Sequence, residues 1–279
     1  MMIGVSSKLM QGFPLEEILR LASITGFAGV EIWMHQVEDS GMSAAVIKKL
    51  AADLGLVLQV HMDTRDVNLT SSNKAIREAS VSQALSAIDF SADLGSRIIT
   101  AHPGRMTSGK ELITRERLWE LQIEAFAALS HLAEQRNVLV CVENMENEKG
   151  EFVLFESDVG RIIQSVGGVG LGVTLDVAHL ASHNAGFAGN DTAQAVAAWK
   201  TPINNVHISQ AGAKMHMPIF AENDTLIDYQ KVFSLLTAKY SGMLIVEGYI
   251  KGQEKETLSR SFQWLCQFPD INIREAFLK

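Results

Sequence analysis

Six short apolar runs in this chain are each followed by a side chain that can bind a metal ion. The six side chains, with the runs before them, are His61 after LVLQV, His102 after RIITA, Glu143 after VLVCV, Asp176 after LGVTL, His207 after INNV and Glu247 after MLIV. Imidazoles and carboxylates together form a ligand set that Zn, Mn, Co or Mg ions accept. The sequence therefore predicts a protein built around a metal centre.

The spacing of the six side chains indicates the elements that must position them. They follow one another at intervals of 41, 41, 33, 31 and 40 residues. Runs of this length that are rich in Val and Ile are typical of strands, and each interval has room for one strand, one helix and two loops. Equivalent strand ends meet at one face of a parallel barrel. We therefore expect an α/β protein, a (β/α)8 TIM barrel with the six side chains at its mouth.

The rest of the chain fits this repeat. Strands are expected at residues 2–5, 28–32, 56–61, 97–101, 138–143, 171–176, 203–208 and 243–247. Between the fourth and fifth of them, apolar residues at spacings of three and four predict a helix with one buried stripe: Leu118, Leu121, Ala125, Leu129 and Leu132. A barrel of this kind needs about 250 residues, so we expect one domain over residues 1–279.

Composition excludes several classes of protein. The formal net charge is −8, from 24 Lys and Arg against 32 Asp and Glu, and no basic tract stands out; this argues against a nucleic-acid partner and gives no support for binding an anionic membrane. The two cysteines, Cys141 and Cys266, form no disulfide framework, and neither an export signal nor an 18-residue apolar run is present. A cytoplasmic protein is expected, and a homo-oligomer stays open.

Four of the side chains suggest a reaction. Glu143 and Glu247 follow the fifth and eighth predicted strands, roughly opposite each other across the mouth, and Asp176 and His207 lie between them in strand order. Four ligands leave two positions of an octahedral shell for substrate oxygens. An ion that chelates a carbonyl and the neighbouring hydroxyl acidifies the C–H bond, and a carboxylate on either face then removes or returns the proton. This favours isomerisation or epimerisation, with Glu143 and Glu247 as the acid/base pair.

Several further histidines could bind a second metal ion or the substrate. His61 and His102 follow the strands before Glu143, and His179 follows Asp176 by three residues, so all three are candidates for a second metal or for the substrate. Glu31, inside the second predicted strand, is interpreted as a partner in the barrel interior rather than a ligand. Three histidines receive no role: His35 and His183 in expected loops, and His131 in the predicted helix.

Taken together, the motifs resemble those of the xylose-isomerase-like barrel superfamily. The matching segments are GVEI at 29–32, His61 with Asn68-Leu69, HPG at 102–104, VEN at 142–144, LDVAH at 175–179, HIS at 207–209 and VEG at 246–248. The superfamily holds sugar and sugar-phosphate isomerases and epimerases, hydroxypyruvate isomerase, two dehydratases of cyclic keto-polyols, and endonuclease IV. In its ketose epimerases a Mn-like ion is held at positions matched here by Glu143, Asp176, His207 and Glu247. The resemblance implies that the two glutamates exchange the proton.

Endonuclease IV is the branch from which this chain departs. That enzyme uses three zinc ions, and its further ligands match His61, His102, His179 and His216. Its last ligand is an Asp two residues before the final His, where this chain has Lys214, which cannot coordinate zinc while protonated. The expected loop WMHQVED after the second strand also lacks an arginine and an aromatic wedge for kinking DNA. Similarity to the isomerase branch implies instead that Lys214 contacts a substrate oxygen beside His216.

We therefore expect a metal-dependent isomerase or epimerase acting on a small sugar, a sugar phosphate or a related keto-polyol. Three alternatives stay open: a keto-polyol dehydratase, a zinc nuclease like endonuclease IV, and a barrel that binds a sugar without turning it over. The sequence distinguishes neither the substrate nor the metal.

Overall fold

The computed structural model describes residues 1–107, 113–183, 192–212, 214–222, 225, 227–269 and 271. Its strands pair in parallel, each with the next along the chain and β8 with β1, so the sheet closes into a barrel. The strands are β1 (Met2–Ser6), β2 (Gly29–Trp33), β3 (Val57–His61), β4 (Ile98–Ala101), β5 (Leu139–Glu143), β6 (Leu171–Asp176), β7 (Asn205–Ile208) and β8 (Met243–Val246). This confirms the predicted (β/α)8 fold.

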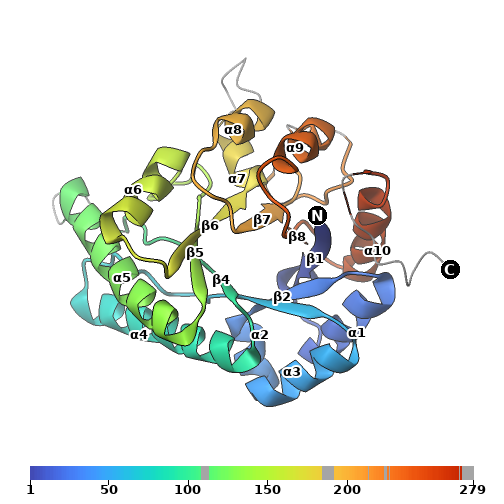
Figure 1. The fold of residues 1–279 in the computed structure, drawn as a ribbon, viewed down its shortest axis with the longest axis horizontal. Helices are drawn as coiled ribbons and strands as arrows, with labels where there is room; N and C mark the ends of the chain where they lie inside the picture. The colour runs from blue at the N-terminus through green and yellow to red at the C-terminus, as the bar shows by residue number, and fades with distance from the viewer. Residues whose placement is uncertain are drawn as a thin grey trace.

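Helices surround the barrel on its outer side (Figure 1). They are the 3-10 helix η1 (Ser7–Met10) and the α-helices α1 (Leu15–Thr25), α2 (Met34–Ser40), α3 (Ala44–Asp53), α4 (Lys74–Leu94), α5 (Arg115–Arg136), α6 (Glu156–Val166), α7 (Val177–Ser182), α8 (Thr192–Ala198), α9 (Tyr229–Leu236) and α10 (Glu254–Leu265). Several of them are followed by a glycine in the left-handed conformation. Gly95, with φ of 84°, follows α4, and glycine suits this position because a residue with a side chain would be strained there. No helix of the described residues is long and apolar enough to cross a membrane.

Two sequence expectations need correction. Strand ends differ from the predicted ones by one or two residues; β8 ends at Val246, so Glu247 follows the strand instead of closing it. The segment after β2 was expected to be a loop but forms α2, which begins directly after Trp33 and ends at Gly41 with φ of 62°. With only seven residues, α2 is too short for the helical spacing of its apolar residues to be recognised in the sequence.

Side chains alternate between the two faces of each strand. In β6, Thr174 points into the barrel, where its hydroxyl lies 3.0 Å from that of Thr100 on β4, and Asp176 follows two residues later on the same face. Leu175 and Val173 lie on the opposite face and belong to the buried apolar core between strands and helices. The inner face near the carboxyl ends of the strands therefore carries the polar groups.

Candidate metal centre

The four side chains expected as ligands come together at the carboxyl ends of β5 to β8. The Nδ1 atom of His207 lies 3.1 Å from Oε1 of Glu143 and 3.6 Å from Oε1 of Glu247. Asp176 contributes an oxygen to two clusters of close ligand atoms, one that contains Glu143 and one that contains Glu247. All four side chains are buried, with at most 4% of any residue exposed. Among the described residues, His207 thus contacts both glutamates and Asp176 shares a cluster with each of them, although no single cluster holds all four side chains.

Charge at this centre is tightly balanced between the carboxylates and the histidines. Burial would raise the pKa of Glu143, but His207 and His102 outweigh it and hold the pKa well below its usual value. Burial would likewise lower the pKa of His207, but Glu31, Glu247 and Glu143 raise it well above its usual value. The imidazole of His207 and the carboxylate of Glu143 therefore stabilise each other's charged forms.

Three buried carboxylate oxygens at this centre accept no hydrogen bond within the described part of the chain: Oε2 of Glu143, Oδ2 of Asp176 and Oε1 of Glu247. The nearest imidazole nitrogens, of His102, His179 and His207, lie 3.0, 3.7 and 3.6 Å from them. Burial raises the pKa of Asp176 to about 6, although His179 lowers it. The ionised form of this carboxylate is therefore less stable here than in water. Unpartnered buried carboxylate oxygens beside an imidazole nitrogen fit a divalent cation. The residues present are thus suited to the metal that their types predict.

Asp176 has a second task in the local structure. Its other oxygen, Oδ1, accepts a hydrogen bond of 2.8 Å from the backbone nitrogen of His179 and so caps the first turn of α7. The backbone of Asp176 is itself fixed by Asn144, whose side chain bonds both the nitrogen and the carbonyl of Asp176. One oxygen is held by the helix, and the free one faces the centre.

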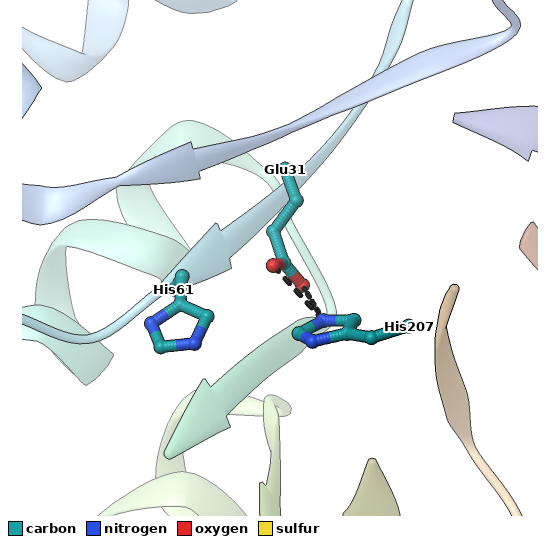
Figure 2. A group of neighbouring side chains, drawn as sticks. All are labelled: Glu31, His61 and His207. Carbon is teal, nitrogen blue, oxygen red and sulfur yellow. Dashed lines mark hydrogen bonds and ion pairs between the residues drawn. The ribbon is translucent and has the colours of Figure 1, made fainter. Parts of the chain in front are cut away.

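Below the centre, Glu31 of β2 contacts the other nitrogen of His207. The carboxylate oxygens of Glu31 lie 3.0 and 3.1 Å from Nε2, and Figure 2 shows the carboxylate directed at the ring with His61 alongside. Glu31 is fully buried, and its Oε2 also accepts hydrogen bonds from Thr100 and Asn205, each of 3.0 Å. Glu31 lies in the barrel interior, as its place in the strand suggested.

His61 and His102 approach the second oxygen of Glu143, and the ring of His61 also stacks against that of His207, with 5.9 Å between centroids. Oε2 of Glu143 is 3.0 Å from Nε2 of His102 and 3.6 Å from Nε2 of His61. Nδ1 of His61 is 2.7 Å from the carbonyl of Met62, and its ring stacks on Trp33 with 3.8 Å between centroids. These histidines and Glu143 form a second cluster of possible ligand atoms.

His179 and His216 lie on the other side of the mouth. His179 Nδ1 is 2.7 Å from the carbonyl of Asn144, and its Nε2 is 3.3 Å from Nε2 of His216. Burial, together with His179, lowers the pKa of His216 to about 3. Lys214 is exposed, so its role beside His216 stays a prediction.

Lys8 is a neighbour of the site that sequence reasoning missed. It lies in η1, directly after β1, with its ammonium 4.4 Å from the centre of the Trp33 ring. Burial would raise the pKa of Glu247, but His207 and then Lys8 outweigh it and bring the pKa to about 2. The signal that could have found Lys8 is its position after a strand, where the side chain faces the mouth.

A cavity of about 250 Å³ adjoins His102 at the ends of β3 to β5. Acidic side chains line much of it, among them Asp63, Glu146 and Glu151. Burial raises the pKa of Glu151 to about 7, partly offset by Arg105. The cavity gives the mouth a side chamber with a mixed polar and apolar lining, large enough for part of a small ligand.

The histidines without an expected role lie outside the four-ligand cluster. His35 belongs to α2 rather than to a loop, and its Nδ1 is 4.0 Å from Asp63. His183 follows α7 and contacts the carbonyl of Met145 at 3.1 Å. His131, on the outer helix α5, contacts Gln135 on the exposed surface.

Comparison with known proteins gives one family match. A family model described as xylose isomerase-like TIM barrel matches residues 19–268. A curated protein of Methanocaldococcus jannaschii, itself uncharacterised, is 23% identical over 282 residues that span all of both chains. A second uncharacterised protein of the same organism is 27% identical over 139 residues, which cover 47% of this chain and 43% of that protein.

Solved structures share the fold along almost the whole chain. A D-tagatose 3-epimerase-like protein has a TM-score of 0.77 and 21% identity, covering 96% of this chain and 99% of its own. An L-ribulose 3-epimerase has a TM-score of 0.76 and 20% identity, with coverage of 95% and 93%. The 3-keto-D-glucoside 4-epimerase of E. coli has a TM-score of 0.78 and 17% identity, with coverage of 96% and 99%. At these identities the likeness shows the fold alone.

Proposed function

The chain belongs to the xylose isomerase-like TIM barrel family, and we propose that it is a divalent-metal-dependent epimerase or isomerase of a small sugar or related keto-polyol. The observation that carries this proposal is the pair of buried carboxylate oxygens on Asp176 and Glu247 that accept no hydrogen bond, the first 3.7 Å from His179 and the second 3.6 Å from Nδ1 of His207. Such oxygens are costly unless a cation meets them. The structurally similar sugar epimerases support the reaction class.

Glu143, Asp176, His207 and Glu247 would hold the ion. A bound divalent ion would polarise a substrate carbonyl and acidify the adjacent C–H bond. Glu143 and Glu247 come from β5 and from the end of β8, with β6 and β7 between them. The pKa values of both carboxyls are lowered, so both are ionised at neutral pH, as a ligand and a proton acceptor must be. One glutamate would take the proton from one face of the carbon, and the other, after taking up a proton from solvent, would donate it to the opposite face.

The side groups of the mouth would bind and orient the substrate. His61 and His102 contact Oε2 of Glu143, and His102 also lines the cavity. Substrate hydroxyls placed there would find donors and acceptors among its polar side chains. Lys8, over the Trp33 ring that stacks on His61, would add a cation whose charge reaches Glu247.

Proton exchange in heavy water tests the proposal. Protein purified without chelators is analysed for bound metal and incubated in heavy water with a panel of ketopentoses, ketohexoses and their phosphates. NMR then detects deuterium at the carbon next to the carbonyl. We expect Glu143→Gln and Glu247→Gln each to lose about 10²–10⁴-fold in exchange rate. Glu256→Gln, an exposed change on α10, serves as the matched control.

Each alternative gives its own result in this experiment. Full exchange in either Gln variant would move the proton transfer to His61, His102 or His179. A product lighter by one water would identify a dehydratase, and binding without exchange by the metal-loaded protein would identify a sugar-binding barrel. Metal-dependent incision of abasic duplex DNA would identify a nuclease, against which Lys214 and the acidic net charge argue.

A further inference from the structure

We propose that Glu31 is a positioning residue for the candidate metal centre, which fixes the ring of His207 so that Nδ1, and not Nε2, is presented to the ion. This inference rests on the proposed metal centre but not on the reaction or the substrate. Glu31 lies on β2, which pairs with β1 and β3, so it reaches His207 across the barrel interior and not along the sheet. Among the described residues, its hydrogen bonds and ion pairs go to His207, Thr100 and Asn205 and to none of the other three candidate ligands.

The contacts of Glu31 specify one role for each nitrogen of His207. Both oxygens of Glu31 lie within 3.1 Å of Nε2, while Nδ1 faces Glu143 and Glu247. A carboxylate only accepts hydrogen bonds, and a neutral imidazole carries one N–H. Without an ion, Nδ1 shares a proton with Glu143, at 3.1 Å. With a cation in place of that proton, the remaining N–H of His207 would lie on Nε2 and donate to Glu31, which would hold the ring with Nδ1 toward the ion.

Asn205 supplies the reason why a carboxylate is required at this position. Its Nδ2 amide lies 3.2 Å from Nε2 of His207, and an amide N–H can only donate. In the native arrangement this amide donates to Oε2 of Glu31, at 3.0 Å. Without Glu31, the amide would still donate to the hydroxyl of Thr100, at 3.1 Å. Nε2 of His207 would then have this amide, a donor, as its neighbour in place of the carboxylate, and the ring would lose the acceptor that holds it.

The surroundings of Glu31 hold the carboxylate in one orientation. Thr100 donates to Oε2 at 3.0 Å, and the hydroxyl of Thr100 also meets Thr174 on β6. Two donors on one oxygen fix the carboxylate plane and leave both of its oxygens near Nε2 of His207. The strands that carry these groups are β2, β4, β6 and β7, so the ring of His207 is oriented by the barrel itself.

The test compares three variants by their affinity for metal. Glu31→Leu removes the acceptor, Glu31→Gln keeps a carbonyl acceptor without the charge, and Gln59→Leu changes the neighbouring buried polar residue of β3, which is in register with Glu31. Dissociation constants for Mn²⁺ and Zn²⁺ are measured by calorimetry on metal-free protein. We expect Glu31→Leu to weaken binding about 10–100-fold, Glu31→Gln to restore part of the loss, and Gln59→Leu to leave the affinity unchanged.

The outcomes separate this inference from the proposed function. Wild-type affinity in Glu31→Leu, or an equal loss in Gln59→Leu, would overturn the positioning role while leaving the metal centre in place. Two ions per wild-type chain that fall to one in Glu31→Leu would also overturn it, because Glu31 would then be a ligand in the cluster it forms with His61 and His207. A wild-type chain that binds neither ion would refute the metal centre itself. If circular dichroism shows that Glu31→Leu does not fold, Glu31→Gln is used for the test instead. Its loss of metal affinity should be smaller than the loss caused by removing a ligand.

Discussion

The two faces of the same strands differ in what their residues do. On β6, Val173 and Leu175 face outward into the apolar layer beneath the helices, and Thr174 and Asp176 face inward. The outward residues have apolar neighbours, whereas inward Asp176 retains an oxygen without a hydrogen-bond partner. The outward residues serve packing, whereas inward Asp176 caps α7 and is also a candidate ligand. The comparison leads us to expect that the outward position affects stability alone and that the inward one affects mainly the proposed metal binding.

The largest effect that would test this separation is expected on the inward face. Asp176→Ala removes a candidate ligand oxygen that accepts no hydrogen bond. The affinity for a divalent metal should therefore fall by more than the ~10–100-fold that loss of a hydrogen bond to a ligand costs. The fold should survive, with a cost of about 0.5–2 kcal/mol for the lost helix cap. Metal analysis and circular dichroism measure the two effects. Unchanged metal content would contradict the assignment of Asp176 as a ligand.

The neighbouring outward residue should show the opposite behaviour. Leu175 is fully buried, and Leu175→Ala leaves a cavity between strand and helix, so the free energy of unfolding should fall by about 2–5 kcal/mol. Metal affinity of the folded protein should stay within about twofold of wild type, because no ligand is moved. Urea unfolding and calorimetry provide the measurements. A large loss of affinity here would show that the two faces are coupled.

A pH series sharpens the comparison for a carboxyl outside the candidate ligands. Burial raises the pKa of Glu151 to about 7 from 4.5, so its contribution to stability is fully present below about pH 4.5 and is lost as the pH rises through about 7. Glu151→Gln should therefore be more stable than wild type at pH 8, by on the order of 1–3 kcal/mol, and show no such gain at pH 4. Urea unfolding of metal-free protein measures this difference. A gain independent of pH would point to packing instead of charge.

The smallest effect is expected at Lys8. Its ammonium lowers the pKa of Glu247 and repels any cation at the centre, so Lys8→Met should tighten Mn²⁺ binding about 2–10-fold. Lys214→Met is the matched control, because Lys214 is exposed and its removal should leave the affinity unchanged. Calorimetry at low salt compares the two. Equal effects of both changes would mean that net charge, and not position, determines the affinity.

Much of the fold was predictable from the sequence because each strand has a local pattern of apolar residues. The run before Glu143 and the run before His207 show the strand pattern, and the intervals between such runs show the repeat. A parallel barrel then brings the residues after the strands to one face. The placement of Asp176 and Glu247 close to His207 follows from this topology, whereas their role as ligands stays a prediction, as do the single domain and the cytoplasmic location.

Other features depend on the stagger of the strands, which no local pattern encodes. Glu31 lies in the middle of β2 and His207 near the end of β7, yet the two meet because the strands are inclined in a closed barrel. For the same reason, the approach of Lys8 to Glu247 could not be read from spacing. The pairing of His102 with Glu143 was open in the sequence, where a second metal and a substrate contact were equal alternatives.

The double use of Asp176 has a consequence for how this barrel can evolve. The same carboxylate begins α7 and offers its free oxygen to the centre, so most substitutions would be selected against on two grounds at once. Asparagine is the exception, because its side chain still caps a helix while it carries no charge for an ion. A descendant that abandoned the metal would therefore have an open mutational path through Asn at this position. Homologues with Asn there would be the natural place to look for barrels of this family that have changed their chemistry.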